Sequence, residues 1–263
     1  MIITAKTLRD QRRALIGWSI GVAALVLLYT SFYPGIKANA AQLDKYFETL
    51  PDALRNAIGT GSISTPVGYL RSEVFSTMGP LLLLILAIGA GARAIAGEEE
   101  GKTLDLLLAN PVTRRTVVLQ KFWAMAGSTT GVGMVLVLAI AVFGPAFGLH
   151  IPLIDVFAAS VSAIALAVSF GSIALAVGCW RGRRAVAIAT ATCLAVASYL
   201  LNVLAPSVQG LTRFQVLSPF YQYIDHDPLR NGFSVPHLLV LVAISAVALV
   251  LAIVAFDRRD LAS

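Results

Sequence analysis

The chain alternates between long apolar stretches and short charged connections. Six stretches contain no Asp, Glu, Lys or Arg and cover approximately residues 14–33, 74–92, 122–147, 156–180, 185–205 and 238–256. A helix rises about 1.5 Å per residue, so roughly 20 apolar residues cross a hydrocarbon core of about 30 Å. The pattern therefore predicts an all-α membrane protein with six transmembrane helices that form a single domain over residues 1–263.

Composition agrees with a membrane protein. Hydrophobic residues make up 57% of the 263 residues and charged residues only 13%, whereas soluble domains have roughly 45–50% and 25%. The mean hydropathy is +0.80. The formal net charge of +6 must therefore be explained within a protein that is mostly embedded in lipid.

The distribution of basic residues predicts the orientation of the spans. Lysines and arginines near spans are retained on the cytoplasmic side, and 14 of the 20 fall on one side if both termini are cytoplasmic. These are Lys6, Arg9, Arg12, Arg13, Arg93, Lys102, Arg114, Arg115, Lys121, Arg181, Arg183, Arg184, Arg258 and Arg259. Cytoplasmic termini are therefore predicted. Topology and membrane lipids account for the pI of 9.6, and no nucleic-acid partner is needed.

The first 13 residues combine apolar and basic side chains ahead of the first span. The apolar members are Ile2, Ile3 and Leu8, and the basic members are Lys6, Arg9, Arg12 and Arg13. We predict an amphipathic helix that lies on the inner membrane surface. A cleaved signal peptide is the alternative, because Ala38-Asn39-Ala40 resembles a cleavage site. The apolar run of about 20 residues is longer than the roughly 7–15 residues of a signal peptide.

Two outer segments are expected to cap or anchor the bundle. Residues 34–73 contain apolar side chains at helical spacing, namely Leu43, Tyr46, Phe47 and Leu50. Residues 206–235 contain prolines and aromatic residues suited to the membrane interface. Re-entry of this second segment into the membrane, with a gating role, is the alternative. Within the third span, Gly127-x-x-x-Gly131 predicts a close approach between helices.

The cytoplasmic connection over residues 93–121 is the largest on its side of the membrane. Three acidic residues, Glu98 to Glu100, directly follow the second span, and residues 103–109 can form a short helix that Asn110-Pro111 ends. One face of that helix would carry Leu104, Leu107 and Leu108. A solvated connector has no need for such a face, so we expect a helix that docks into a groove on a soluble partner.

Familiar catalytic patterns are incomplete or missing in the sequence. The string GEEEGKT, residues 97–103, resembles a phosphate-binding loop, but position 96 is alanine where that motif has glycine, and the glutamates would repel phosphate. We find neither a nucleophile elbow nor a metal-binding H-E-x-x-H motif. The predicted spans also lack the ionisable residues that ion-coupled carriers and intramembrane enzymes usually need. We therefore expect no catalytic or metal-binding residues, and the sequence does not identify substrate-binding ones.

The run AGEEEGKTLDLLLANPVTRRTVVLQK, residues 96–121, closely resembles the signature of ABC transporter type 2 (ABC-2) permeases. The matching positions are Glu98, Glu99, Gly101, Thr103, Leu104, Asp105, Leu107, Leu108, Pro111, Thr113, Arg114 and Lys121. Lys102 is an extra residue relative to that signature. The stretches LPDALRNAIG, Gly68-Tyr69-Leu70 and SPFYQY (residues 50–59, 68–70 and 218–223) are also similar to the bacterial branch of this family.

The resemblance implies the membrane-spanning subunit of an ATP-driven exporter in the bacterial cell membrane. Two identical or similar permease copies would pair, and a dimer of separate cytosolic ATPase subunits would bind ATP and Mg. This chain would then hold no cofactor and would not be an enzyme. The resemblance assigns ATPase coupling to Glu98, Glu99, Glu100, Gly101, Thr103, Leu104, Asp105, Leu107, Leu108, Pro111 and Arg114. The alternatives are a stand-alone secondary carrier, an intramembrane enzyme and a passive scaffold.

Overall fold

The computed structural model describes residues 2–39, 42, 45, 49, 65–104, 112–208 and 210–259. This part of the chain contains six helices that are long and apolar enough to cross a membrane, which confirms the predicted spans. They are α2 (Arg12–Ala38), a continuous span from Pro66 to Ala94, α9 (Arg114–Ala146), α10 (Leu153–Arg181), α11 (Arg184–Leu204) and α15 (Val235–Arg258). The described residues form no strand, so the all-α fold is confirmed as well.

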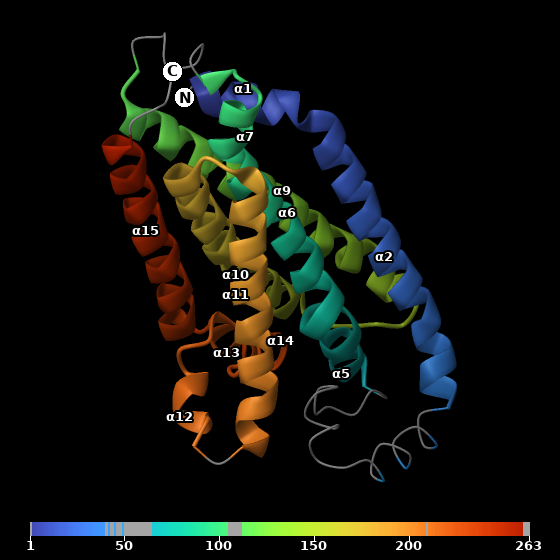
Figure 1. Ribbon diagram of the computed structural model, residues 1–263. Helices are drawn as coiled ribbons and strands as arrows, with labels where there is room; N and C mark the ends of the chain where they lie inside the picture. The colour runs from blue at the N-terminus through green and yellow to red at the C-terminus, as the bar shows by residue number, and fades with distance from the viewer. Residues whose placement is uncertain are drawn as a thin grey trace.

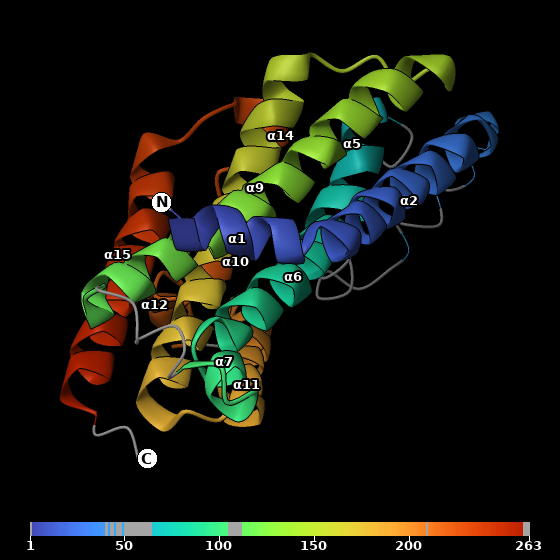
Figure 2. The same cartoon turned by 90° about the horizontal axis from the view of Figure 1, so that it is seen from above.

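Helix α10 is the centre of the bundle. It packs against α9, α11, α15 and α6 (Gly79–Ala94), which is the inner part of the second span (Figure 1). Helix α2 packs mainly against α9 and runs along the outside of the bundle, as Figures 1 and 2 both show. The apolar window of α10 is 61% buried, whereas those of α2 and α11 are each 17% buried. Helices α2 and α11 therefore present most of their surface outward.

Two glycines allow α6 and α10 to pack with their backbones in contact. A Cβ atom at Gly91 would lie 2.1 Å from the carbonyl oxygen of Gly171, and one at Gly171 would lie 2.9 Å from the carbonyl oxygen of Ala87. Such close approach through small residues is common between membrane helices. At Gly127 and Gly131 an added Cβ would meet nothing within 4 Å. The close approach predicted at these two glycines is therefore wrong within the part of the chain that the structure describes.

The second span begins earlier than predicted, at Pro66, and contains a π-helix, η1 (Arg71–Met78). The N–H of Gly79 donates to the carbonyl oxygen of Val74, five residues back. Any side chain at Gly79 would place its Cβ 2.8 Å from that oxygen, and Pro80 has no N–H to donate. The Gly79-Pro80 pair thus explains why the α-helical pattern of α5 (Pro66–Leu70) resumes only after the π-helix.

The third span also starts earlier than predicted, because Thr113 caps α9. The Thr113 side chain accepts a hydrogen bond from the N–H of Thr116 at 3.2 Å, a typical arrangement at the start of a helix. The helix therefore includes Arg114 and Arg115, which the sequence had placed in the preceding connection. At the first span, α2 continues to Ala38 with Pro34 inside it.

The first described residues and the end of α15 lie at one end of the bundle (Figure 1), which we call the terminal face. It consists of α1 (Ile2–Asp10), α7 (Ala96–Glu100) and the adjoining ends of α9, α10, α11 and α15 (Figure 1). Helix α1 crosses this face and packs against α9 (Figure 2). Helix α1 and the start of α2 cover the residues where an amphipathic helix was expected, and its place on the membrane surface stays a prediction.

The opposite end of the bundle is capped by the segment predicted to cover it. This segment forms the short helices η2 (Ala205–Ser207), α12 (Thr212–Gln215), α13 (Pro219–Ile224) and α14 (Pro228–Asn231). Helix α13 packs against α10, α11 and α15, and α14 packs against α10. The apolar residues at helical spacing in the other outer segment, from Leu43 to Leu50, lie outside the described residues.

Candidate functional site

The connection after the second span folds back onto the terminal face. Gly101 ends α7, and Lys102 follows in the left-handed region with a φ of 53°. The N–H of Thr103 then donates to the carbonyl oxygen of Glu98 at 2.8 Å and closes the turn. Lys102, the extra residue relative to the family signature, therefore lies at the turn itself, after the end of α7.

Leu104 returns to the interior of the bundle directly after this turn. Its side chain is 4% exposed and belongs to a buried cluster with Ile95 and Val117. Leu104 therefore holds the connection against this chain's own core. Residues 105–111, which include Asp105, Leu107, Leu108 and Pro111, lie outside the described residues, so the predicted docking helix stays a prediction.

Glu98 ties α7 to α9. Its Oε1 lies 2.5 Å from Nζ of Lys121, whose side chain is buried, and its Oε2 accepts a hydrogen bond from Thr103. Burial by itself would raise the pKa of Glu98, but hydrogen bonds from Lys121 and Thr103, with the charge of Lys121, lower it below the usual glutamate value. Glu98 consequently stays ionised and paired near neutral pH.

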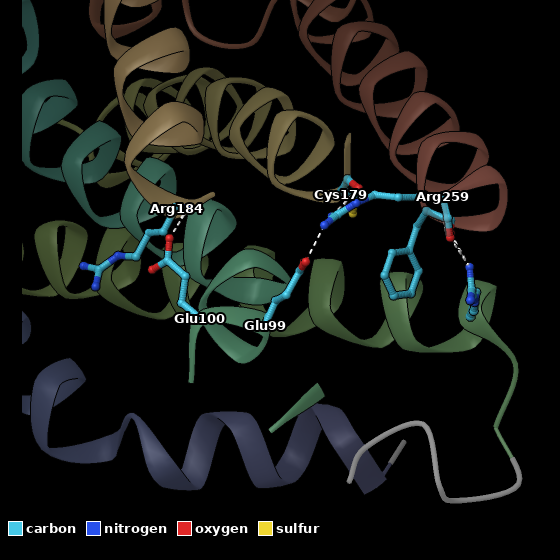
Figure 3. Close-up of polar contacts among 7 residues, drawn as sticks. Glu99, Glu100, Cys179, Arg184 and Arg259 are labelled. Atoms are coloured by element: carbon cyan, nitrogen blue, oxygen red, sulfur yellow. Dashed lines mark hydrogen bonds and ion pairs between the residues drawn. The ribbon is translucent and has the colours of Figure 1, made fainter. Parts of the chain in front are cut away.

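Glu99 ties α7 to the end of α15. Figure 3 shows its carboxylate facing Arg259, whose Nη2 donates to Oε1. The Nη1 of Arg259 also donates to the carbonyl oxygen of Cys179, near the end of α10, at 3.3 Å. Gly182 ends α10 with a φ of 63°, and a Cβ there would lie 2.5 Å from the Glu99 carboxylate. This junction of three segments therefore requires glycine at position 182.

Glu100 ties α7 to the beginning of α11. Its Oε1 accepts the main-chain N–H of Arg184, the first residue of that helix, at 2.8 Å (Figure 3). The first N–H groups of a helix lack partners within it and form the positive end of its dipole, so a carboxylate is favourable there. Three successive carboxylates thus attach α7 to α9, α15 and α11.

The start of α9 is fastened to the end of α15. Nη1 of Arg114 donates to the carbonyl oxygens of Phe256 at 3.0 Å and Arg259 at 2.7 Å. Nε of Arg115 lies 2.7 Å from Oδ2 of Asp257. Cationic groups suit the unpaired carbonyls at a helix C-terminus. Arg114, which the resemblance assigned to the ATPase, is therefore engaged within this chain in the structure.

The string SPFYQY, residues 218–223, fixes the opposite end of the bundle. The hydroxyl of Ser218 caps α13 and donates to the carbonyl oxygen of Ser198 in α11 at 2.9 Å. The hydroxyl of Tyr223 donates to the carbonyl oxygen of Phe75, in the π-helix, at 2.6 Å. In the π-helical pattern that carbonyl would accept from Pro80, which has no N–H. Tyr223 supplies the missing donor.

We predict that Tyr223→Phe destabilises the permease by about 1–3 kcal/mol, because it leaves the buried carbonyl of Phe75 without a donor. The matched control is Tyr221→Phe, two residues away, because the hydroxyl of Tyr221 interacts with the exposed Asp225. Unfolding by increasing SDS in mixed micelles, followed by circular dichroism, measures the difference. Equal stabilities of the two variants would contradict the role assigned to Tyr223.

A groove of about 620 Å³ lies between α2, α6 and α11. Most of its lining is apolar and includes Trp18, Leu84, Ile88, Ile188, Val196 and Phe220. Ser76 and Thr77 of the π-helix line one end, and Arg93 and Arg184 line the other, at the terminal face. Sequence reasoning missed this groove, because its apolar residues have the same pattern as residues that face lipid.

Six apolar spans, a charged loop fastened to one end and an apolar groove along the side define a multi-pass helical membrane protein. Residues 1–261 match the family model described as "ABC-2 family transporter protein". The chain belongs to the ABC-2 transporter family, so it is the membrane component of an ABC transporter, and the resemblance found in residues 96–121 is confirmed. Comparison with curated proteins gives no match.

Proposed function

We propose that this chain is the permease subunit of an ABC exporter, forms half of a dimeric translocation pathway, and is driven by separate cytosolic ATPase subunits. Membership of the ABC-2 family supports ATP-driven transport. The observation that carries the proposal is the attachment of α7, in which three successive glutamates bind Lys121 of α9, Arg259 at the end of α15 and the first N–H of α11. A movement imposed on this loop would therefore reach three spans besides the one that precedes it.

In this proposal, the loop between the second and third spans has a side that holds the bundle and a side that binds the ATPase. Leu104 belongs to the first, because it is already buried in this chain. The docking role falls to Leu107 and Leu108, with Asp105 and Pro111 on either side of them. Both flanks of this segment are fixed, by Leu104 before it and by Arg114 after it.

We place the terminal face in the cytoplasm and the chain in the bacterial cell membrane. The bases of this placement are the family and the excess of lysines and arginines at that end of the spans. Helix α1, with Lys6 and Arg9 exposed, would lie against anionic headgroups of the inner leaflet. Membrane lipids are therefore partners of this face, next to the ATPase.

A second permease copy, identical or similar, would complete the pathway. Support comes from α2 and α11, which are each only 17% buried and flank the open groove. ATP and Mg would bind to the partner ATPase, so the permease would take part in no catalytic step itself. In this arrangement the groove becomes part of the pathway between the two copies.

The test is a double substitution of Leu107→Asp with Leu108→Asp, made in the permease co-expressed with the ATPase encoded beside it. Burying two charges in an apolar groove of the ATPase is costly. We therefore expect the amount of ATPase retained and the permease-stimulated ATP turnover each to fall by about tenfold or more, the effect of roughly 1.4 kcal/mol. Leu217→Asp is the matched control, because Leu217 is 75% exposed at the opposite end. Unchanged co-purification and turnover in the double variant would refute the docking role, and a stand-alone carrier would retain no ATPase in either form.

A further inference from the structure

Positive charge gathers at one end of the apolar groove between α2, α6 and α11. Arg93 lies in the last turn of α6, and Arg184 is the first residue of α11. Among the described residues that line the groove, only these two are charged. The remaining lining is apolar or carries hydroxyl groups, so the groove has a cationic end at the terminal face and an uncharged body.

Neither guanidinium forms an ion pair with a carboxylate in the part of the chain that the structure describes. Nε of Arg93 donates to the carbonyl oxygen of Gly89 at 3.0 Å. Glu100 accepts the main-chain N–H of Arg184 and leaves its guanidinium available. In Figure 3 that guanidinium extends away from the Glu99–Arg259 pair. Two unpaired arginines from different helices thus meet at the mouth of the groove.

A second, polar cavity of about 310 Å³ beneath α1 adjoins the groove at the same two arginines. Three carboxylates, those of Asp10, Glu98 and Glu100, line this cavity but not the groove, and Glu98 is paired there with Lys121. On the groove side, no carboxylate among the described residues offsets the charge of the two arginines, so an anion is attracted there. Arginine is well suited to such a site, because its planar fork binds phosphate and carboxylate groups through paired hydrogen bonds.

We propose that the groove binds an anionic lipid of the inner leaflet, with its phosphate between Arg93 and Arg184 and an acyl chain along the apolar body. Lipid tails are as apolar as the groove wall, so selectivity comes from the headgroup. The proposal rests on the proposed function for the orientation of the terminal face. It deepens that function by naming the class of solute that the same groove takes.

Trp18 provides a reporter, because it lines the groove. The other two tryptophans, Trp123 and Trp180, are 61% and 59% exposed and do not line it. The probe is phosphatidylglycerol with brominated acyl chains, since bromine quenches tryptophan fluorescence on contact. A Trp123→Phe, Trp180→Phe permease in phosphatidylcholine nanodiscs is titrated with this lipid, and in parallel with phosphatidylcholine that carries the same brominated chains.

We expect Trp18 to be quenched at a lower mole fraction of the anionic lipid than of the neutral one. Arg93→Gln with Arg184→Gln should reduce this preference by at least about tenfold, because the loss of even one charge-assisted hydrogen bond has that effect. Arg183→Gln is the matched control, because Arg183 is exposed and does not line the groove. Lysine at both positions retains the charge, so this variant should keep part of the preference.

Equal quenching by the two lipids would overturn the proposal. A preference that survives the double glutamine variant would overturn the site, because it would show that the two arginines do not provide selectivity. The assay contains no ATPase, so its failure is distinguishable from failure of the proposed function, which is tested by ATPase binding and stimulated turnover.

Discussion

Gly91→Ala is expected to destabilise the permease by about 2 kcal/mol and to separate α6 from α10. The added Cβ would lie 2.1 Å from the carbonyl oxygen of Gly171, and a main-chain oxygen in a helix cannot rotate away. Overpacking of this kind costs about 3 kcal/mol at the upper end of its usual range. Alanine gains about 1 kcal/mol over glycine in helix propensity, so the clash outweighs the gain.

Two matched substitutions test whether the clash at Gly91 is what destabilises the protein. At Gly89, in the same helix, an added Cβ would meet only the end of the Arg93 side chain, at 3.8 Å, and at Gly127 it would meet nothing within 4 Å. Both alanine variants gain helix propensity without a clash, so they should be as stable as the parent or more stable. Titration with SDS, followed by circular dichroism, measures all three. Stability of Gly91→Ala equal to that of Gly89→Ala would show that the two backbones do not touch.

Arg259→Glu is expected to leave the ATPase bound but to reduce its stimulated turnover. The substitution removes the donor to Glu99 and to the carbonyl of Cys179, which costs about 1.5–3 kcal/mol for charged hydrogen bonds, and it places two carboxylates together. Helix α7 would then lose its attachment to α10 and α15. The docking residues Leu107 and Leu108 are untouched, so binding and stimulation should separate, unlike in the Leu107→Asp, Leu108→Asp variant.

Exchanging the charges of Glu99 and Arg259 tests whether the ion pair between them is responsible for the stimulated turnover. Glu99→Arg combined with Arg259→Glu should restore part of the lost turnover, because the two opposite charges face each other again. Arg258→Glu is the control, because Arg258 is the adjacent residue and its side chain is exposed. Pull-down of the ATPase and ATP turnover are measured on the same preparations. If Arg259→Glu stimulated turnover as well as Arg258→Glu does, the proposed transmission through Glu99 would be refuted.

These expectations give the acidic run a different meaning from the one its sequence suggested. By resemblance, Glu98, Glu99 and Glu100 belong to the ATPase interface. In the structure, each carboxylate binds a group at the terminal face of this same chain. Their role in coupling is therefore proposed as attachment of the loop to the spans, while contact with the partner is proposed for the leucines that follow.

The sequence by itself determined the six spans, the family and the charged loop. A span must be apolar over its whole length, because lipid offers no partner for charges. Each span can therefore be recognised from its own consecutive residues. The π-helix can also be traced to a local cause. Gly79 has no side chain that would clash with the carbonyl oxygen of Val74, and Pro80 has no N–H to donate. The sequence did not show that the hydroxyl of Tyr223 donates to the carbonyl of Phe75, because 148 residues separate the two groups.

Only the tertiary structure decided which glycines bring helices together and which charges meet. Gly127 and Gly131 have the spacing of a close helix contact and open space around them, whereas Gly91 and Gly171 touch although they belong to different spans. In the same way, Glu99 meets Arg259 across 160 residues, and Arg93 and Arg184 both line the groove, where no described acidic residue accompanies them. A span's hydrophobicity depends on its own residues, but contacts of this kind depend on how the helices rotate and cross when they pack.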